Sequence, residues 1–242
     1  MRVLILFMSN MDARQELILK AIIEEHIRTA EPVGSKALTD GYGLDVSSAT
    51  VRNEMVTLEE NGYLRQPHTS AGRVPTEKGY SHYIARFVKS SMKQEPSREL
   101  RRAVSASHSQ EETLRLLAKA LVRLSGDMVI AAFGTNRAYY TGFSQLVNKP
   151  DFQRLELLQS LTSLLDRFDE ITGTVMRGLA EEPQVMIGEY NPFGEETAAV
   201  VVKCRLPNGR TVFLGLVGPM RMDYQKNLGL MEQVVEILGK KT

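Results

Sequence analysis

The chain has 242 residues, 43% of them hydrophobic and 24% charged, with a formal net charge of +1. This composition is typical of one large or two ordinary globular domains and excludes a disordered chain. A single cysteine, Cys204, excludes a disulfide framework and a cysteine-rich zinc site, and we interpret it as an inert thiol in a half-buried strand.

Residues 1–11 are predicted to be an extension before the first domain. The apolar run Val3–Met8 is too short for a signal-peptide core, and no small-residue cleavage site follows it. No apolar run in the sequence approaches the roughly 20 residues of a membrane-spanning helix. We therefore expect a cytoplasmic protein with no membrane partner.

Two helices are predicted before residue 41. Asp12 is a suitable N-cap for a helix that runs to about Thr29. Its inward-facing residues are expected to be Leu17, Ile18, Ala21, Ile22 and Ile27. After a break at residues 31–34, Ser35 is predicted to cap a short helix over Lys36–Asp40.

A third helix is predicted from Ser47 to Asn61, and it organises the first part of the chain. Val51, Met55 and Leu58 recur at helical spacing and give it one apolar face. Gly62 ends it, because glycine adopts the left-handed conformation that helix C-termini favour. Three helices with a short turn before the last predict a helix-turn-helix.

A basic hairpin and a fourth helix follow. Strands are expected at Tyr63–Gln66 and at Arg73-Val74, on either side of a turn at residues 69–72, and Thr76 is expected to start the helix. Five cations stand between Asn61 and Ser91 against one acidic residue. Clustered cations indicate phosphate contacts better than the total charge does. The hairpin therefore predicts a wing, and residues 12–90 a winged helix-turn-helix domain.

The rest of the chain is predicted to hold a linker and a second domain. Residues 91–108 are polar and are interpreted as the linker. Residues 109–242 combine helices, among them one over Pro150–Phe168 lined by Leu155, Leu158, Leu161 and Leu165, with strands paired across Asn208-Gly209. Helices beside an antiparallel sheet predict an α+β domain.

Several runs of residues resemble the heat-inducible transcription repressor family, HrcA. They are EPVGSKAL, SSATVRNEM, LEENGYL and QPHTSAGRVPTEKGY in the first 80 residues, and YYTGFSQLVNKPDF, IGEYNPFGE and GLVGPMRMDY further on. The resemblance implies a winged-helix domain followed by a GAF-like domain. It also implies a homodimer that represses chaperone genes by binding an inverted-repeat operator in double-stranded DNA, with the chaperonin as modulator and relief on heat stress.

The sequence departs from the family in one place. The family resemblance leads us to expect an inserted dimerising segment between Met128–Gly134 and Tyr139–Ser144, where this chain has only four residues, 135–138. Without that segment, the GAF-like sheet and the closing helix are the alternative dimer surfaces.

The third helix and the hairpin supply the candidate DNA-binding residues. In a helix-turn-helix the N-terminal part of the last helix reaches base edges, which selects Ser47, Ser48, Thr50, Arg52 and Asn53. Arginine pairs with guanine and asparagine with adenine, so Arg52 and Asn53 are the expected base readers. The alternative for Arg52 is a surface ion pair with Glu59 or Glu60.

The candidate phosphate contacts lie in the wing. They are His68, Thr69, Ser70, Gly72 and Arg73, because small hydroxyls and glycine permit close backbone approach and Arg73 supplies charge. The alternative is a solvated turn. Lys78, at the start of the fourth helix, is either a phosphate contact or simply exposed.

The second domain offers a ligand site as an alternative function. In the NPFGEE and GPMRMDY runs, the residues are either pocket-lining groups or turn formers, and we favour turns because Asn-Pro and Gly-Pro mark turns. A ligand-sensing regulator is therefore the second hypothesis. We expect no cofactor and no metal. No nucleophile–base pair accompanies the carboxylates Asp166, Asp169 and Glu170, so an enzyme is not expected.

Overall fold

The structure is a computed structural model that describes residues 11–89, 97–133, 138–206 and 209–239. The described residues fall into two compact units, which divide between Lys89 and the segment that starts at Ser97. No helix within these ranges is long and apolar enough to cross a membrane.

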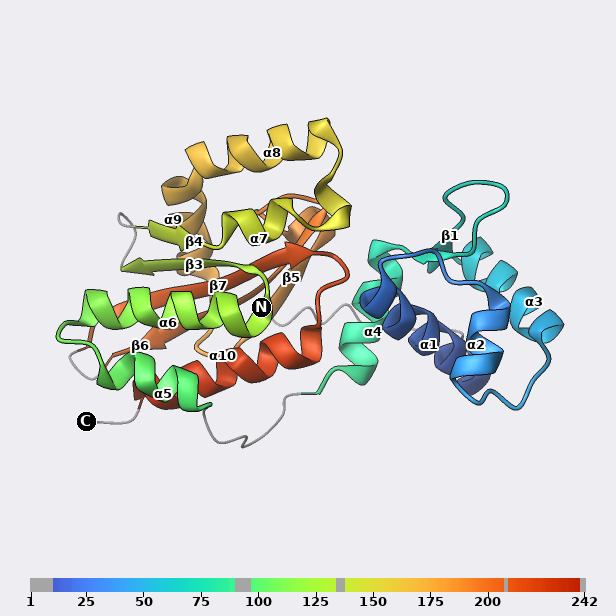
Figure 1. Cartoon of the computed structure of the whole chain (residues 1–242), viewed down its shortest axis with the longest axis horizontal. Coiled ribbons are helices and arrows are strands. Elements are labelled where there is room, and N and C mark those ends of the chain that lie inside the picture. Colours follow the sequence, from blue (N-terminus) through green and yellow to red (C-terminus); the bar gives the residue numbers. More distant parts are fainter. Residues whose placement is uncertain (1–10, 90–96, 134–137, 207–208, 240–242) are drawn as a thin grey trace. The chain divides into compact units, whose positions relative to one another are not determined.

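The first unit contains four helices and a two-stranded hairpin among its described residues (Figure 1). In chain order they are α1 (Ala13–Thr29), α2 (Ser35–Gly41), α3 (Ser48–Glu60), β1 (Leu64–Arg65), β2 (Val74–Pro75) and α4 (Glu77–Phe87). Strands β1 and β2 pair antiparallel, with Arg65 opposite Val74. The expected order of helices and hairpin is therefore present.

Helix α3 begins and ends as the sequence predicts. The Ser47 hydroxyl accepts a hydrogen bond from the Thr50 N–H at 3.1 Å, which satisfies one of the free N–H groups of the first turn. Gly62 follows the helix at a φ of +76°, a conformation that costs glycine little. Val51, Met55 and Leu58 are all buried against the rest of the unit.

Two predictions about the first helices are wrong. Leu17 is 55% exposed, whereas Leu19 and Ile23 are fully buried. Ile18, Ala21 and Ile22 are buried as predicted, but the rest of the buried stripe of α1 differs, because its direction depends on where α3 and α4 pack. Helix α2 has Gly34 at its N-cap, and Ser35 is its first helical residue.

The second unit is a five-stranded antiparallel sheet between helices. Its described strands are β3 (Met128–Phe133), β4 (Ala138–Thr141), β5 (Gln184–Ile187), β6 (Thr197–Arg205) and β7 (Thr211–Pro219), in the spatial order β4-β3-β7-β6-β5. The long hairpin β6–β7 is present as predicted; its register places Arg205 opposite Thr211, and Gly209 in its turn has a φ of +80°. Asn208 of the predicted turn lies outside the described residues. The fold class is α+β.

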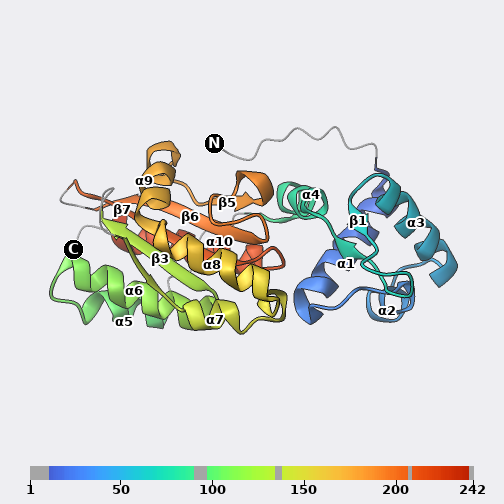
Figure 2. The ribbon, with the colours of Figure 1, turned by 90° about the horizontal axis from the view of Figure 1, so that it is seen from above.

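Helices cover both faces of this sheet (Figures 1 and 2). They are α5 (Arg98–Ser105), α6 (Gln110–Ser125), α7 (Phe143–Val147), α8 (Leu155–Asp166), α9 (Phe168–Gly178) and α10 (Tyr224–Gly239), with short 3₁₀ turns at Pro150–Phe152 and Gly188–Tyr190. Ile130, Val201 and Phe213 pack under α7, α8 and α9. Neighbouring residues such as Val200 and Leu214 point to the opposite face, where α6 and α10 lie.

The prediction of a single helix over Pro150–Phe168 is wrong. A 3₁₀ turn, α8 and the start of α9 occupy these residues. Leu155 is 67% exposed because it is the first residue of α8, and the buried residues of this helix, Leu161 and Leu164, lie further on. Part of the expected linker is helical: α5 buries Leu100 and contacts α6 and α10.

At the position where the family resemblance predicts an inserted segment, the chain passes from β3 to β4 with only four residues between the two strands. Val129–Ala132 of β3 pair with Ala138–Thr141 of β4, and residues 134–137 between them lie outside the described residues. Strand β4 is one edge of the sheet.

Candidate nucleic-acid interface

Hydroxyl groups fix the start of α3. Besides capping the helix, the Ser47 hydroxyl lies 2.9 Å from the Thr50 hydroxyl. The Ser48 hydroxyl lies 2.9 Å from that of Ser35 and so joins the starts of α2 and α3. Three of the five candidate DNA-binding residues of α3, Ser47, Ser48 and Thr50, therefore hold the first turn of this helix in place.

The other two predicted readers, Arg52 and Asn53, are exposed: Asn53 lies opposite the buried residues of α3, and Arg52 lies on the flank of the helix. Among the described residues, the Arg52 side chain forms no ion pair or hydrogen bond, and Glu59, one of its two alternative partners, is bound elsewhere. A guanidinium without an internal partner has five donors available to an external one.

The hairpin is fastened to α3 by Glu59. One carboxylate oxygen, Oε2, lies 2.8 Å from Nε of Arg73, and the other, Oε1, accepts a hydrogen bond from the Gln66 N–H at 2.9 Å. The Arg73 Nε–H is not aligned for a hydrogen bond, so this contact is an ion pair only. The Arg73 side chain is 16% exposed. Its charge is balanced inside the protein.

Gln66 also shapes the tip of the hairpin. Its side-chain amide donates to the carbonyl groups of Thr69 and Ala71, both at 3.0 Å. His68, Thr69 and Ser70 are exposed at this tip. Sequence reasoning missed both Gln66 and Glu59. The sequence could have pointed to Gln66, because an amide side chain just before a turn can donate hydrogen bonds to the carbonyl groups of that turn.

Gly72 is required by a close contact within the unit. A Cβ atom at this position would lie 2.4 Å from the carbonyl oxygen of Val33. The next residue, Arg73, exchanges two backbone hydrogen bonds of 2.9 Å with Val33, which adds a third chain segment beside the hairpin. The close approach of the Val33 carbonyl group is thus a reason for glycine at this position that the sequence did not reveal.

Lys78 has partners inside the protein. Its Nζ donates to the carbonyl oxygen of Asn61 at 2.8 Å and lies 4.4 Å from the centre of the Tyr63 ring. It therefore neutralises the C-terminal end of α3, where helix carbonyl groups attract a cation.

Two further exposed cations belong to this surface and were not selected from the sequence. Lys36 stands in the first turn of α2, next to the residue whose hydroxyl contacts Ser48, and Arg65 stands on β1. Neither side chain forms an ion pair or hydrogen bond within the described part of the chain. The sequence could have pointed to Lys36, because it directly follows Ser35 at the start of the predicted second helix.

In the second unit, the two runs considered as a ligand pocket form internal contacts. The Asn191 side chain donates to the carbonyl oxygen of Thr197 at 2.9 Å and accepts from the Phe193 N–H, as a turn former does. Arg221 binds the Asp151 carboxylate with Nη2–Oδ2 at 2.6 Å, and Asp223 caps α10. These contacts agree with the turn interpretation.

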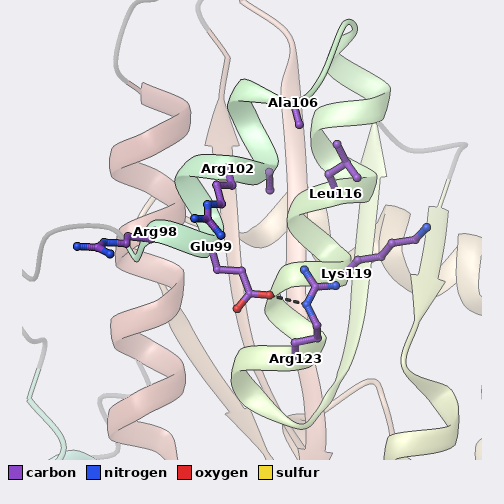
Figure 3. A pocket seen from close by; sticks show the side chains of 8 residues that line it. Arg98, Glu99, Arg102, Ala106, Leu116, Lys119 and Arg123 are labelled. Carbon is purple, nitrogen blue, oxygen red and sulfur yellow. Dashed lines mark hydrogen bonds and ion pairs between the residues drawn. The ribbon is translucent and has the colours of Figure 1, made fainter.

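A groove elsewhere in the second unit has four cations among its eight lining residues. It lies between α5 and α6 and has a volume of about 490 Å³. Figure 3 shows Glu99 and Arg123 in contact at its centre, with Arg102 beside them and Arg98 and Lys119 at its two sides. This groove does not include the NPFGEE or GPMRMDY residues.

Known proteins resemble the chain over most of its length. The family model of the HrcA protein C-terminal domain matches residues 46–228, more than half of the chain. A heat-inducible transcription repressor HrcA from Bifidobacterium adolescentis is 46% identical over 121 residues, which are 50% of this chain and 32% of that protein. Another from Desulforamulus reducens is 43% identical over 234 residues, 95% of this chain and 63% of that protein.

These alignments span between about a third and two thirds of the curated relatives' own length. One solved structure, described as a hypothetical protein, matches with a TM-score of 0.76 at 20% identity and covers 94% of this chain and 97% of its own. It supports the fold alone. The sequence matches, which include the third helix, the hairpin and much of the second unit, go further: the chain belongs to the HrcA family of heat-inducible transcription repressors.

Proposed function

We propose that the chain is a sequence-specific DNA-binding repressor of heat-shock genes, and that its first unit is a winged helix-turn-helix domain. The observation that carries this proposal is the surface of α3. Arg52 and Asn53 are exposed there, and a hairpin is held beside them by Glu59. The curated relatives are named as repressors, not as enzymes.

In this proposal α3 lies in the major groove. Arg52 donates two hydrogen bonds to guanine O6 and N7, and Asn53 pairs with N6 and N7 of adenine. Ser47, Ser48 and Thr50 hold the N-terminus of α3 against the DNA, where the positive end of the helix favours a phosphate. Lys36 and Arg65 add phosphate contacts from α2 and β1.

In this proposal the wing binds DNA because the hairpin is held where its tip can contact the DNA backbone. His68, Thr69 and Ser70 at its tip approach the sugar–phosphate backbone, as exposed hydroxyl and imidazole groups can. Gly72 and Arg73 serve the interface by holding the hairpin against Val33 and Glu59. Lys78 supports the end of α3 through the Asn61 carbonyl.

The proposed repressor acts as a homodimer on an inverted-repeat operator, because two identical domains match a palindromic site. Its second unit is then a GAF-like domain, with helices over both faces of an antiparallel sheet. A connection of only four residues joins β3 to β4, so the edge of this sheet is a candidate dimer surface. Modulation by the chaperonin and relief on heat stress complete the proposed mechanism.

Footprinting tests this function. The full chain is added to genomic fragments upstream of the chaperone genes of its own source, and protection of an inverted repeat is expected. Arg28→Ala serves as a control, because Arg28 is 70% exposed but already paired with Glu25 on α1. Protection at unrelated sites only, or none, would reject the proposal.

A ligand-sensing regulator is the second candidate function, and the groove between α5 and α6 favours it. Its cationic lining suits an anionic metabolite. Thermal-shift screening separates the candidates, since a ligand that binds only the folded state raises the melting temperature by mass action. A metabolite that stabilises the wild type but not Arg102→Gln would support this candidate.

A further inference from the structure

The outermost strip of α3 consists of four exposed residues at helical spacing. They are Ala49, Asn53, Val56 and Glu60. Residues four, seven and eleven positions apart lie on one side of a helix. This strip is opposite the buried Val51, Met55 and Leu58, so it is the part of α3 that reaches furthest into a groove.

Val56 stands out in this strip because it is apolar and 40% exposed. Isolated exposed apolar residues are common and need no explanation by themselves. A β-branched residue on an exposed helix face, however, gains little from burial and has a lower helix propensity than alanine. What gives Val56 significance is its place, one turn beyond Arg52 and Asn53.

We propose that Val56, together with Ala49, reads the C5-methyl groups of thymines in the operator. This inference rests on the proposed function. Thymine is the base that carries a methyl group in the major groove, and apolar side chains discriminate it by burying that group. Asn53, between the two, is suited to adenine by its amide. The strip therefore recognises A·T pairs beside the guanine read by Arg52.

The length of the strip sets how many base pairs it reads. Ala49 and Val56 are seven positions apart, which is about 10 Å along a helix, or roughly three base-pair steps of 3.4 Å. Glu60 follows one turn later, and its carboxylate repels the phosphates. Val56 is therefore the last residue of this strip that contacts a base.

Uracil substitution tests this assignment, because uracil differs from thymine only by the absent methyl group. The full wild-type chain first selects a duplex from a random pool. Each thymine of that duplex is then replaced by uracil in turn, and the dissociation constants are compared for wild type, Val56→Ala and Leu17→Ala. Leu17 is the matched control, since it is apolar and 55% exposed but lies on α1.

We expect uracil at the thymine that Val56 contacts in each half-site to weaken wild-type binding about fourfold, the effect of one buried methyl group. Val56→Ala loses most of this penalty, whereas Leu17→Ala keeps it. Equal penalties in wild type and Val56→Ala at every position would overturn the assignment and leave DNA binding intact. If the pool yields no enriched sequence, the proposed function itself fails.

Discussion

Arg73 and Glu59 form an ion pair between the hairpin and α3, with Nε 2.8 Å from Oε2. The same carboxylate also receives the Gln66 N–H. Arg73, a candidate phosphate contact in the sequence, therefore also helps to hold the hairpin on α3, and this has a measurable consequence.

Arg73→Ala should lower the free energy of unfolding by about 1 kcal/mol, the scale of a partly exposed ion pair. It should leave the salt dependence of DNA binding nearly unchanged, because no phosphate contact is removed. Arg65→Ala is the matched variant: it should reduce the slope of log K against log salt by about 0.9 with little loss of stability. The reverse pattern would show that Arg73 contacts the phosphate.

Gly72→Ala should destabilise the first unit. The added Cβ lies 2.4 Å from the Val33 carbonyl oxygen, so the hairpin must move, and overpacking of this kind costs about 1–3 kcal/mol. DNA affinity should fall with it. Gly41→Ala is the control, since nothing lies within 4 Å of its Cβ. Urea unfolding of the two variants checks this, and equal stabilities would contradict it.

These two residues also show where sequence reasoning reaches its limit. The limits of α3 were predictable from Ser47, Gly62 and the spacing of Val51, Met55 and Leu58, because capping and periodicity are local. The partners of Gly72 and Arg73 were not. Val33 lies about 40 positions away in the chain, and only the folded unit brings it to the hairpin.

In the second unit, too, local features were predictable from the sequence and long-range packing was not. The β6–β7 hairpin was predictable from its Asn208-Gly209 turn, because turn chemistry is local. The burial of α5 was missed because its sequence is mostly polar, with only Leu100 and Ala103 buried. Leu155 was wrongly placed inside because periodicity cannot tell where a helix begins to touch the core.

The stability of the first unit should fall as the pH drops below 6.5. Burial lowers the pKa of His82 below its ordinary value of 6.5, against the opposing effect of Glu16. The unfolded chain therefore binds a proton at His82 before the folded chain does, and stability is lost from pH 6.5 down to the folded-state pKa. Unfolding of His82→Gln should depend less on pH in this window. Identical pH profiles for wild type and variant would contradict it.

Cys204 should be unreactive in the native protein. Burial raises the pKa of its thiol to about 12, so the reactive thiolate is scarce at pH 8. A thiol-specific reagent should label the protein only after denaturant is added. Rapid labelling of the native chain would show that β6 opens or that the thiol is accessible.

The most direct test of the account concerns Arg52. Wild type and Arg52→Ala are titrated with the selected duplex and with random DNA of the same length and salt concentration. Arg52→Ala should lose about 1–3 kcal/mol of binding free energy on the selected duplex, with relaxed preference at one base pair and little change on random DNA. Equal losses on both DNAs would contradict base reading by α3.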